Sequence, residues 1–546
     1  MKMNFCRTIV AAVFLLLFPV LAACSASRTD GKELIKKAVE LTVAACEIYP
    51  ALTNLDTCID KVSRNILKSR GVKPERIEEI FREQKIADED YVRTMPVDPI
   101  RTPEMQTLRV AMIKVIDVII ASCMIEPMIS NLDDCFDNAY HAILSSRDPH
   151  SGYMNKEELV EATMQMSGSL EGIGAEVALT EDNAIGVVRV MPGSPAEMAG
   201  VLGGDRIVAV VNGGDRSPSS SFSTIGAAIK KIRGKPNTKV TLEILRGEKD
   251  TFVTTTITRA AVKIEMVETE ILAAPNDPKI KYAYVKITQF GYFLRTKMVT
   301  ALTEILDRNK DVKGIVFDVR GNPGGLLNEV NDAVRVLLAR DEVLLSIRDN
   351  NGITAYRPVP SGETLPSAGS DITNGLPVAV LINDRSASAS EIFAGALKEF
   401  DRAVLIGTGT WRKGSIQTIQ SLGDGSASKL TEGEYLIGSP TKWVAVQCVG
   451  VEPDIAYEAE VAWKPKKESH ECDSLGAIVS GGVRSDGGTV KKPLIERDPA
   501  LYRMGERMLE AVKAFDHVTF VKNEKVRKQL KVPLPKDDPE EESNKK

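Results

Sequence analysis

Short apolar runs that alternate with amphipathic stretches organise the second half of the chain. Four runs have the composition of buried strands: KYAYVKI (281–287), GIVFDV (314–319), PVAVLI (377–382) and AVLIG (403–407). Apolar residues recur at helical spacing between and after them, at 296–309, 327–339 and 391–400. Parallel strands need long crossover connections, which helices supply. The pattern therefore predicts an α/β core over residues 259–460.

The preceding segment alternates polar and apolar residues as half-buried strands do. Strand patterns lie at 186–191, 206–211 and 239–245, with a helical stretch at 224–232. The punctuation of VMPGSPAEMAGVLGGDRIVAVVNG (190–213) resembles that of a PDZ module, which predicts a small β-sheet with helices over residues 165–258.

PDZ domains bind a chain end by strand addition, and backbone N–H groups surround its terminal carboxylate. The sequence Gly172-Ile173-Gly174 is the candidate for that loop, because glycines let the backbone approach an anion closely. The alternative is a small β-domain that only separates its neighbours. We favour peptide binding.

A duplicated pattern occupies the N-terminal region. CEIYPALTNLDTCIDKVSRNIL (46–67) and CMIEPMISNLDDCFDNAYHAIL (123–144) align without gaps, and an amphipathic stretch precedes each copy. We predict a helical region over 24–155 in which each copy forms a helix, a Pro-containing loop and a second helix. Asn54 and Asn131 are candidate N-caps of the second helices, which would place Cys58 and Cys135 in their first turns.

The first residues read as an export signal. Lys2 and Arg7 precede an apolar run (8–23) that is too short to span a bilayer comfortably. The ending LAAC (21–24) resembles the lipobox of bacterial lipoproteins, in which the cysteine, here Cys24, is lipidated after removal of residues 1–23. Export to the periplasm with an N-terminal lipid anchor follows, and Ser25 favours the outer membrane. A plain secretory signal that ends near Ala23 is the alternative, and it also exports the chain.

Composition narrows the classes of function. The 546 residues carry 70 Lys and Arg against 75 Asp and Glu, a net charge of −5, so a nucleic-acid-binding role is disfavoured. Four histidines without a His-Glu-x-x-His pattern disfavour a zinc hydrolase, and we predict neither a metal nor another cofactor. At the C-terminal end we predict a helical region (461–531) and a charged disordered tail (532–546).

An exported chain is expected to oxidise its cysteines. Outside the signal and the lipid site, six remain, and the repeat predicts the pairs Cys46–Cys58 and Cys123–Cys135, which leaves Cys448 with Cys472. For the short loop that each repeat pair closes, the chain-entropy relation gives a stabilisation of about 3 kcal/mol per bridge. The alternative is six reduced, buried thiols.

Candidate chemistry lies after the strands of the α/β core, where open sheets place their sites. Ser386, Ser388 and Ser390 follow one strand at the start of a helix, close to the partial positive charge of its N-terminus. The alternative interpretation is that Ser388 is only a helix cap, because Glu391 completes a capping box. No Gly-x-Ser-x-Gly motif with a plausible histidine accompanies these serines.

A lysine can replace histidine as the base if its surroundings remove its proton. Lys413 is the candidate, and its pKa would have to fall from about 10.4 by roughly three units. Gln417 can hold the amine by hydrogen bonding. A Ser-x-x-Lys string at Ser426 and Lys429 lies in a Gly/Ser loop without a Lys-Thr-Gly partner, and we interpret it as chance.

Seven motifs in fixed order resemble the carboxyl-terminal processing (tail-specific) protease family across about residues 148–456: DPHSGYM, GIGAEV, PGSPAEMAG, DVRGNPGGLL, SASASEIFAGAL, KGSIQ and GVEPDI. The resemblance implies a serine endopeptidase with Ser388 as nucleophile, Lys413 as base and Gln417 beside it. It also implies an oxyanion hole from the backbone N–H groups of Gly324 and Ala389. The substrates it implies are proteins with non-polar, poorly structured C-terminal tails.

The chain departs from the family pattern at two places. Trp411-Arg412 stands where the family usually has Phe-Gly or similar, so the resemblance does not carry over the local gate or the substrate preference, and the repeated N-terminal region lies outside the pattern. Two other hypotheses remain: a catalytically silent PDZ scaffold that binds protein C-termini, and a structural envelope protein. The sequence leaves an adaptor protein and a homo-oligomer open.

Overall fold

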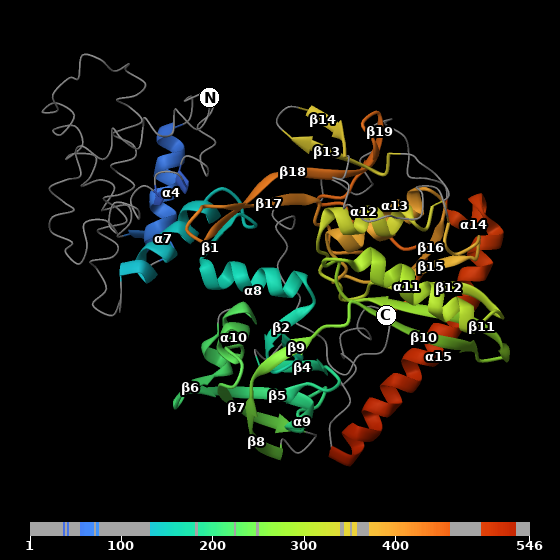
Figure 1. Ribbon diagram of the computed structural model, residues 1–546, viewed down its shortest axis with the longest axis horizontal. Helices are drawn as coiled ribbons and strands as arrows, with labels where there is room; N and C mark the ends of the chain where they lie inside the picture. The colour runs from blue at the N-terminus through green and yellow to red at the C-terminus, as the bar shows by residue number, and fades with distance from the viewer. Residues whose placement is uncertain are drawn as a thin grey trace, which may run out of the picture. The chain divides into compact units, whose positions relative to one another are not determined.

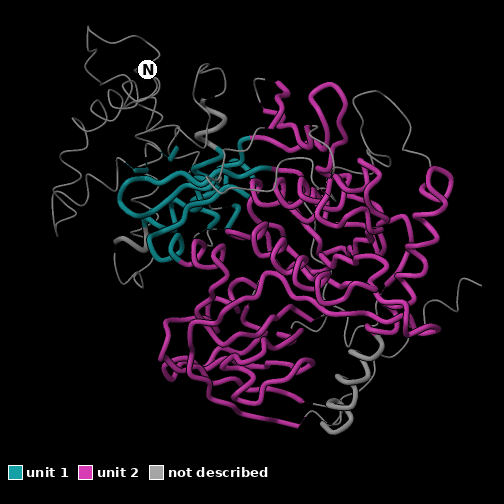
Figure 2. The backbone as a smooth tube through the Cα atoms, turned by 45° about the vertical axis from the view of Figure 1, so that its right-hand side comes forward, with its two compact units in different colours: residues 1–160, 416–432 teal, residues 161–415, 433–546 magenta. Residues whose placement is uncertain are grey.

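The computed structural model divides the chain into two compact units (Figures 1 and 2). Residues 1–160 and 416–432 form the first unit, and residues 161–415 and 433–546 form the second. The residues that the structure describes are 37–38, 41–42, 55–69, 73–75, 132–180, 184–222, 225–246, 251–338, 343–349, 352–356, 371–458 and 493–530.

The first unit contains the second helix of each repeat copy. Helix α4 (Leu55–Ser69) and helix α7 (Leu132–Ser145) begin at equivalent positions and pack against each other. Val62, Ile66 and Leu67 are buried in one copy, and their equivalents Ala139, Ile143 and Leu144 are buried in the other. The predicted return helices are therefore confirmed, and Cys58 and Cys135 lie in their first turns. Cys46, Cys123 and the candidate caps lie outside the described residues.

Strand β1 (Gly152–Met154) pairs antiparallel with the first residues of β18 (Ala427–Ser439), which joins it to the same unit. The Ser-x-x-Lys string enters β18. Ser426 Oγ donates to Asp424 at 2.5 Å, and Lys429 lies three residues further along the extended chain. The Ser426 hydroxyl is therefore engaged by Asp424, and no hydrogen bond joins it to Lys429 among the residues that the structure describes.

The PDZ domain lies in the second unit, as one sheet with two helices. Its strand order is β3 (Ala175–Leu179), β4 (Ile185–Val190), β5 (Arg206–Asn212), β7 (Lys239–Arg246), β8 (Thr251–Thr258), and β6 (Asp215–Pro218) also pairs with β5. Helices α9 (Pro195–Met198) and α10 (Ile225–Ile232) accompany it, and Ala196, Ala228 and Ile232 enter its apolar core. Strands β2 (Ser169–Gly172) and β9 (Ala260–Lys263) form a separate pair.

The α/β core is built on a sheet of six strands in the order β10, β11, β12, β15, β16, β20. All neighbours in it are parallel except β10 and β11. The strands are β10 (Val267–Ala274), β11 (Asp277–Ile287), β12 (Val312–Asp318), β15 (Val378–Ile382), β16 (Ala403–Gly407) and β20 (Ile455–Ala456). The predicted α/β class with parallel strands is confirmed.

Helices cover both faces of this sheet (Figure 1). Helices α11 (Leu294–Arg308), α12 (Leu327–Arg335) and α13 (Ala389–Glu399) serve one face, where Phe393 meets Phe317 with ring centroids 5.4 Å apart. On the other face, α14 (Leu494–Arg497) and α15 (Pro499–Leu530) bury Leu494, Met508, Leu509 and Val512. Gly314 and Gly505 allow this close approach, because a Cβ at either would collide with Met508 or Val404.

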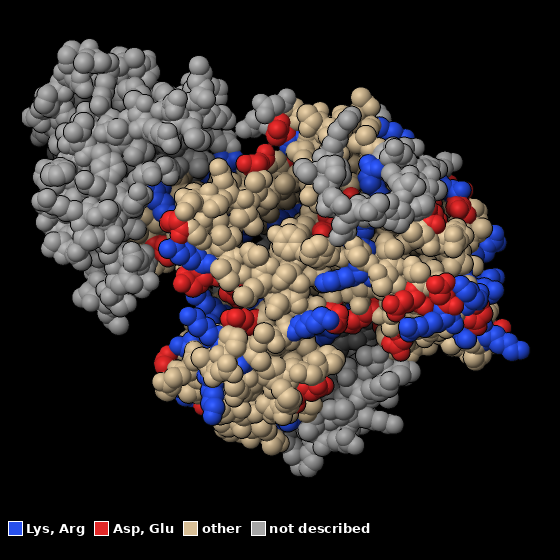
Figure 3. Space-filling model, in the orientation of Figure 1, with Lys and Arg blue, Asp and Glu red and all other residues tan. Residues whose placement is uncertain are grey.

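The remaining described elements complete the two units. Helix α8 (Lys156–Met166) links them along the chain; β13 (Leu345–Asp349), β14 (Gly352–Ala355), β17 (Ser415–Ser421) and β19 (Lys442–Ala445) join the sheet of β18, and η1 (Ser219–Ser221) is a short 3-10 helix. On the face drawn in Figure 3, Lys and Arg are interspersed with Asp and Glu. No helix within the described ranges is long and apolar enough to cross a membrane.

Candidate active site

Two loops at one edge of the core sheet carry the predicted nucleophile and base. Strands β15 and β16 pair in parallel, so their carboxyl ends lie at the same edge. The chain leaves β15 at Ile382 and reaches Ser388 at the start of α13, and it leaves β16 at Gly407 and reaches Lys413 before β17. Parallel pairing therefore explains why residues 25 positions apart share a site.

Of the three serines after β15, only Ser388 reaches the surface. Ser386 and Ser390 are fully buried, and their hydroxyls donate to the carbonyl oxygens of Val319 at 2.8 Å and Asn322 at 2.9 Å. Ser388 is half-buried, with φ 55° and ψ −114°, in a region that non-glycine residues rarely adopt. The strained backbone at this one accessible serine is what a reactive residue at a sharp strand-to-helix turn requires.

Glu391 links the two loops through their main chains. Its Oε2 accepts the N–H of Ser388 at 2.8 Å and the N–H of Lys413 at 2.9 Å. Its Oε1 accepts the Thr410 hydroxyl at 2.6 Å and the N–H of Arg412 at 2.7 Å. A carboxylate has lone pairs for all four donors, so the ionised side chain fits this environment.

Burial raises the pKa of Glu391 from 4.5 to about 7. The four donors favour the charged form and oppose that rise, but they do not outweigh the loss of hydration. The side chain is fully buried, so water does not hydrate its charged form. The link between the two loops therefore titrates near neutral pH.

Tyr435 in β18 makes a second link between the same two residues. Its hydroxyl lies 3.1 Å from the carbonyl oxygen of Ser388 and also donates to the carbonyl oxygen of Lys413. Burial, followed by the neighbouring Glu391, raises the pKa of Tyr435 well above its usual range, so the hydroxyl stays a donor. Ser388 and Lys413 thus share one acceptor for their N–H groups and one donor for their carbonyls.

Gly324 lies directly against the nucleophile. It has φ +103°, and a Cβ built on it would lie 2.7 Å from the Ala387 carbonyl oxygen and 2.9 Å from both Ala389 N and Ser388 Cβ. No side chain fits there, which explains the second half of the RGNPGG motif. The predicted oxyanion donors are therefore adjacent.

The two predicted donors differ in their present partners. The Gly324 N–H donates to Asn322 Oδ1 at 2.9 Å. The Ala389 N–H is in the first turn of α13, where helical amides have no intrahelical acceptor, and it has no partner within the described part of the chain. The Ala389 N–H is thus without an acceptor among the described residues, whereas the Gly324 N–H is bound to Asn322, and their predicted oxyanion role stays a prediction.

Gln417 belongs to the other compact unit. It lies in β17, and its side-chain nitrogen donates to Thr431 Oγ1 at 3.3 Å. Thr431 Oγ1 in turn donates to Asp148 Oδ1 at 2.9 Å, which ties the DPHSGYM motif to this strand pair. The predicted role of Gln417 toward the Lys413 amine stays a prediction.

The Trp411-Arg412 departure has a structural counterpart at Cys448. Arg412 and Cys448 both have positive φ, 78° and 61°. The Cys448 N–H donates to the Arg412 carbonyl at 3.0 Å, and the Gly414 N–H donates to Gln447 Oε1 at 2.6 Å, so Lys413 is flanked by two bonds to one segment. Cys448 is disulfide-bonded, and its predicted partner Cys472 lies outside the described residues.

The predicted carboxylate loop directly precedes β3, the edge strand of the PDZ sheet. Gly174 has φ +75°, and a Cβ on it would lie 2.4 Å from Ser194 Cβ. The carbonyls of Ile173 and Gly174 accept the N–H groups of Ala196 and Met191. The N–H groups of Ile173 and Gly174 have no acceptor among the residues that the structure describes. Strand β3 ends the sheet order, so a peptide strand can add beside it.

Glu391 and Asn322 were assigned no catalytic role from the sequence, and Tyr435 was not singled out. The capping box indicated a local role for Glu391 as its fourth residue. Its hydrogen bonds to residues 410–413 join segments that are far apart in the sequence, so no local pattern predicts them. Asn322 accepts from Ala387 N and Ser390 Oγ through its carbonyl, inside a motif recognised only for its glycines. No three His, Cys, Asp or Glu side chains in the described ranges are grouped to hold a metal ion.

Comparisons with known proteins show what the chain is similar to. The profile of peptidase family S41 matches residues 281–457, and that of the PDZ domain matches residues 186–246. A carboxy-terminal-processing protease of Bartonella bacilliformis is 32% identical over 368 residues, which cover 66% of this chain and 79% of the relative. The carboxy-terminal processing protease CtpB of Bacillus subtilis is 33% identical over 324 residues, 59% of this chain and 62% of the relative.

Among solved structures, the photosystem II D1 C-terminal processing protease is similar with a TM-score of 0.43 and 26% identity. The match covers 66% of this chain and 90% of that one. The PDZ domain of a carboxy-terminal protease from Vibrio cholerae, solved with a peptide, is 30% identical with a TM-score of 0.17, covering 18% of this chain and 99% of that one.

Proposed function

We propose that this chain, which belongs to the carboxy-terminal processing protease family of S41 peptidases and carries that family's PDZ domain, hydrolyses peptide bonds through a Ser388–Lys413 dyad. The observation that carries the proposal is the pair of shared partners. Glu391 and Tyr435 each bond to the main chains of both residues, and Ser388 is the accessible serine of its cluster. This arrangement supports a dyad held by its backbone.

In the proposed reaction, the neutral Lys413 amine takes the Ser388 hydroxyl proton as the oxygen attacks the scissile carbonyl. The carbonyl oxygen becomes an oxyanion at the N-terminus of α13, where the Ala389 N–H can donate to it. The protonated lysine then gives its proton to the leaving amine, and the C–N bond breaks to leave an acyl-serine. Water, deprotonated by the same lysine, releases the acyl group.

Substrate selection is proposed to begin at the PDZ domain. The edge position of β3 and the two N–H groups at Ile173 and Gly174 support binding of an extended chain end with its carboxylate in the loop. Proteins with unstructured, apolar C-terminal tails are the substrates that fit. The proposed reaction uses neither a cofactor nor a nucleic acid.

Location rests on the N-terminal residues alone. The LAAC ending at Cys24 supports lipidation after an export signal, with the enzyme facing the periplasm from the outer membrane. The disulfide at Cys448 accords with an oxidising compartment. Fractionation of Cys24→Ala checks the anchor: the variant should leave the membrane fraction, and its retention there contradicts lipidation.

The alternative is a silent scaffold that binds chain ends without cutting them. Two peptides of one sequence with an apolar end, one with a free carboxylate and one amidated, separate the readings. We expect the full chain to cleave the free peptide at least about tenfold faster, because only its carboxylate brings a negative charge and two acceptor oxygens to the loop amides, whereas the amidated end has one acceptor and adds a donor. Tight binding of the free peptide without any cleavage would establish the scaffold. Equal cleavage of both would remove the PDZ domain from substrate selection.

A further inference from the structure

The turn after β12 is fastened at several points to the segment that carries the nucleophile. The Gly321 N–H donates to Asn383 Oδ1 at 2.9 Å, and the Ala387 N–H donates to the Asn322 carbonyl at 3.0 Å. Gly324 then lies against Ser388. Any displacement of residues 320–325 therefore changes the surroundings of the nucleophile and of the predicted oxyanion donors.

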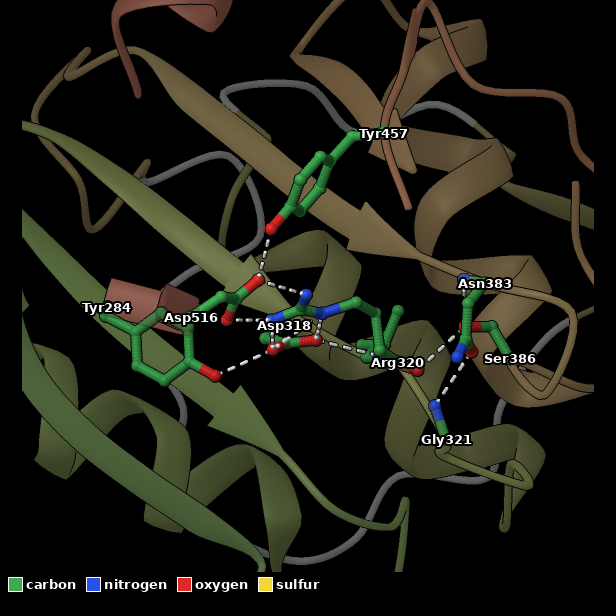
Figure 4. Close-up of polar contacts among 9 residues, drawn as sticks. Tyr284, Asp318, Arg320, Gly321, Asn383, Ser386, Tyr457 and Asp516 are labelled. Carbon is green, nitrogen blue, oxygen red and sulfur yellow. Dashed lines mark hydrogen bonds and ion pairs between the residues drawn. The ribbon is translucent and has the colours of Figure 1, made fainter. Parts of the chain in front are cut away.

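Arg320 anchors the start of this turn between two carboxylates (Figure 4). Its Nε lies 3.0 Å from each Asp318 oxygen, and its Nη2 donates to Asp318 Oδ2 at 2.6 Å. On the other side, Nη1 donates to Asp516 Oδ2 at 2.7 Å and Nη2 lies 3.2 Å from Asp516 Oδ1. The guanidinium is thus bound by Asp516 through two nitrogens, a geometry that fixes its orientation as well as its position.

The three charged groups are withdrawn from water and satisfied by one another. The side chains of Asp318, Arg320 and Asp516 are 3%, 17% and 16% exposed. Burial alone would lower the pKa of Arg320, but Asp318 and Asp516 outweigh it and raise that pKa well above its usual range. Two tyrosine hydroxyls complete the group: Tyr284 donates to Asp318 at 2.7 Å and Tyr457 donates to Asp516 at 2.9 Å.

Asp516 comes from the C-terminal helix, 196 residues beyond Arg320. Helix α15 packs on the core sheet through Met508, Leu509 and Val512, and Phe515 meets Tyr284 with ring centroids 5.1 Å apart. These apolar contacts are sufficient to cover the sheet. They do not require a carboxylate at the next position, whose two oxygens both accept from the Arg320 guanidinium, with Oδ2 also accepting from Tyr457.

We infer that Asp516 is a positioning residue of the protease: through Arg320 it fixes the 320–325 turn against Ser388, so the C-terminal helix is part of the catalytic machinery. The inference rests on the proposed function for its kinetic consequences. Asp516 touches no substrate and acts through the geometry of the turn. Its loss should lower kcat while substrate binding by the PDZ domain, and hence KM, changes little.

The test compares three full-length variants in a tail-peptide assay with separate kcat and KM. Asp516→Asn keeps the size but places an amide N–H₂ among donors, and we expect kcat to fall about tenfold or more with KM within about twofold. Asp516→Glu keeps the charge and should restore much of kcat. Glu510→Gln is the matched control, because Glu510 lies exposed on the same helix and pairs only with Lys513 among the described residues; it should behave as wild type.

Two further measurements separate positioning from simple stability. Asp516→Asn combined with Arg320→Gln should be no slower than Arg320→Gln alone, because both act through one contact. Amide hydrogen exchange of the 319–327 segment should rise in Asp516→Asn and not in Glu510→Gln. A wild-type kcat in folded Asp516→Asn, additive effects, or unchanged exchange in the turn would overturn the inference. If the wild type proves inactive, the proposed function fails, whereas the exchange result still decides the role of Asp516.

Discussion

At the scale of single residues, the site depends on side chains that hold the main chain of Ser388 and Lys413. Glu391 is the clearest case, because one buried carboxylate accepts four donors from both loops. Protonation would turn one of its oxygens into a donor facing donors. Because the pKa of Glu391 is about 7, this protonation, and with it the loss of hydrogen bonds to the two loops, should occur at mildly acidic pH.

Glu391 should make activity and stability respond to pH in opposite directions. Activity needs the carboxylate, so it should fall as pH drops through about 7. The pKa of Glu391 is raised on folding, so its contribution to stability is present below the unfolded value of 4.5 and is lost as pH rises toward about 7. Measuring kcat/KM and Tm from pH 5 to 8 for wild type and Glu391→Gln isolates both effects, since the variant cannot ionise.

We expect Glu391→Gln to lose activity about tenfold or more, because an amide offers one acceptor oxygen to four donors. Its remaining activity should fall less steeply below about pH 7 than that of the wild type, because only protonation of the Lys413 amine then lowers it, and its Tm should lack the corresponding slope. Glu399→Gln, at the end of the same helix, should keep both. A variant profile parallel to wild type would show that another group titrates.

Some residues of the site were predictable and others were not, for identifiable reasons. Ser388 and Lys413 follow apolar runs that read as buried parallel strands, and the strand ends fix their location. Gly324 was predicted through the family resemblance of its motif, and the structure adds the reason for the glycine, because no side chain fits there. Tyr435 and Asp516 act over long sequence separations through partners that leave no periodic signal.

At the scale of elements, the loop that carries Lys413 is supported by the segment around Cys448. Two hydrogen bonds connect the segments on either side of the lysine, and the disulfide restrains one of them. Both segments contain non-glycine residues with positive φ, a conformation that persists only where its surroundings impose it. The disulfide is therefore expected to matter for catalysis as well as for stability.

Cys448→Ser should lower kcat severalfold in enzyme that remains folded. A reducing agent should bring the wild type to the same level and should have no further effect on the variant. Cys472→Ser should reproduce the phenotype, because Cys472 is the predicted partner. A reductant that slows Cys448→Ser as much as wild type would place the sensitive bridge elsewhere, and unequal Cys448 and Cys472 variants would contradict the pairing.

Strands that are buried on both faces of a sheet were predicted well, and strands that are exposed on one or both faces were predicted poorly. Strands β12, β15 and β16 are almost continuously buried, so their sequences are apolar runs. Strands β8, β10 and β17 are largely exposed or half-buried and rich in Thr, Glu and Gln, and they were not predicted. Their position depends on pairing with distant partners, which a local pattern does not contain.

At the scale of the whole molecule, each of the two units has a distinct part in the account. The first contains the paired return helices of the repeat, with equivalent positions buried in each copy. The second contains the PDZ domain, the core sheet and the C-terminal helix, so the residues proposed for tail binding, for chemistry and for positioning the turn belong to one compact unit. We propose that this unit cuts peptide bonds with Ser388 and Lys413.

The most direct measurement of that claim is kcat/KM for Ser388→Ala, Lys413→Ala and their combination in the tail-peptide assay. Each single variant should lose at least about 10³-fold, and the double variant should be no worse than the worse single one, because the two residues act as a unit. Ser426→Ala, at the Ser-x-x-Lys string, should retain wild-type activity. Substantial cleavage by Ser388→Ala, or loss of activity in Ser426→Ala instead, would contradict the account.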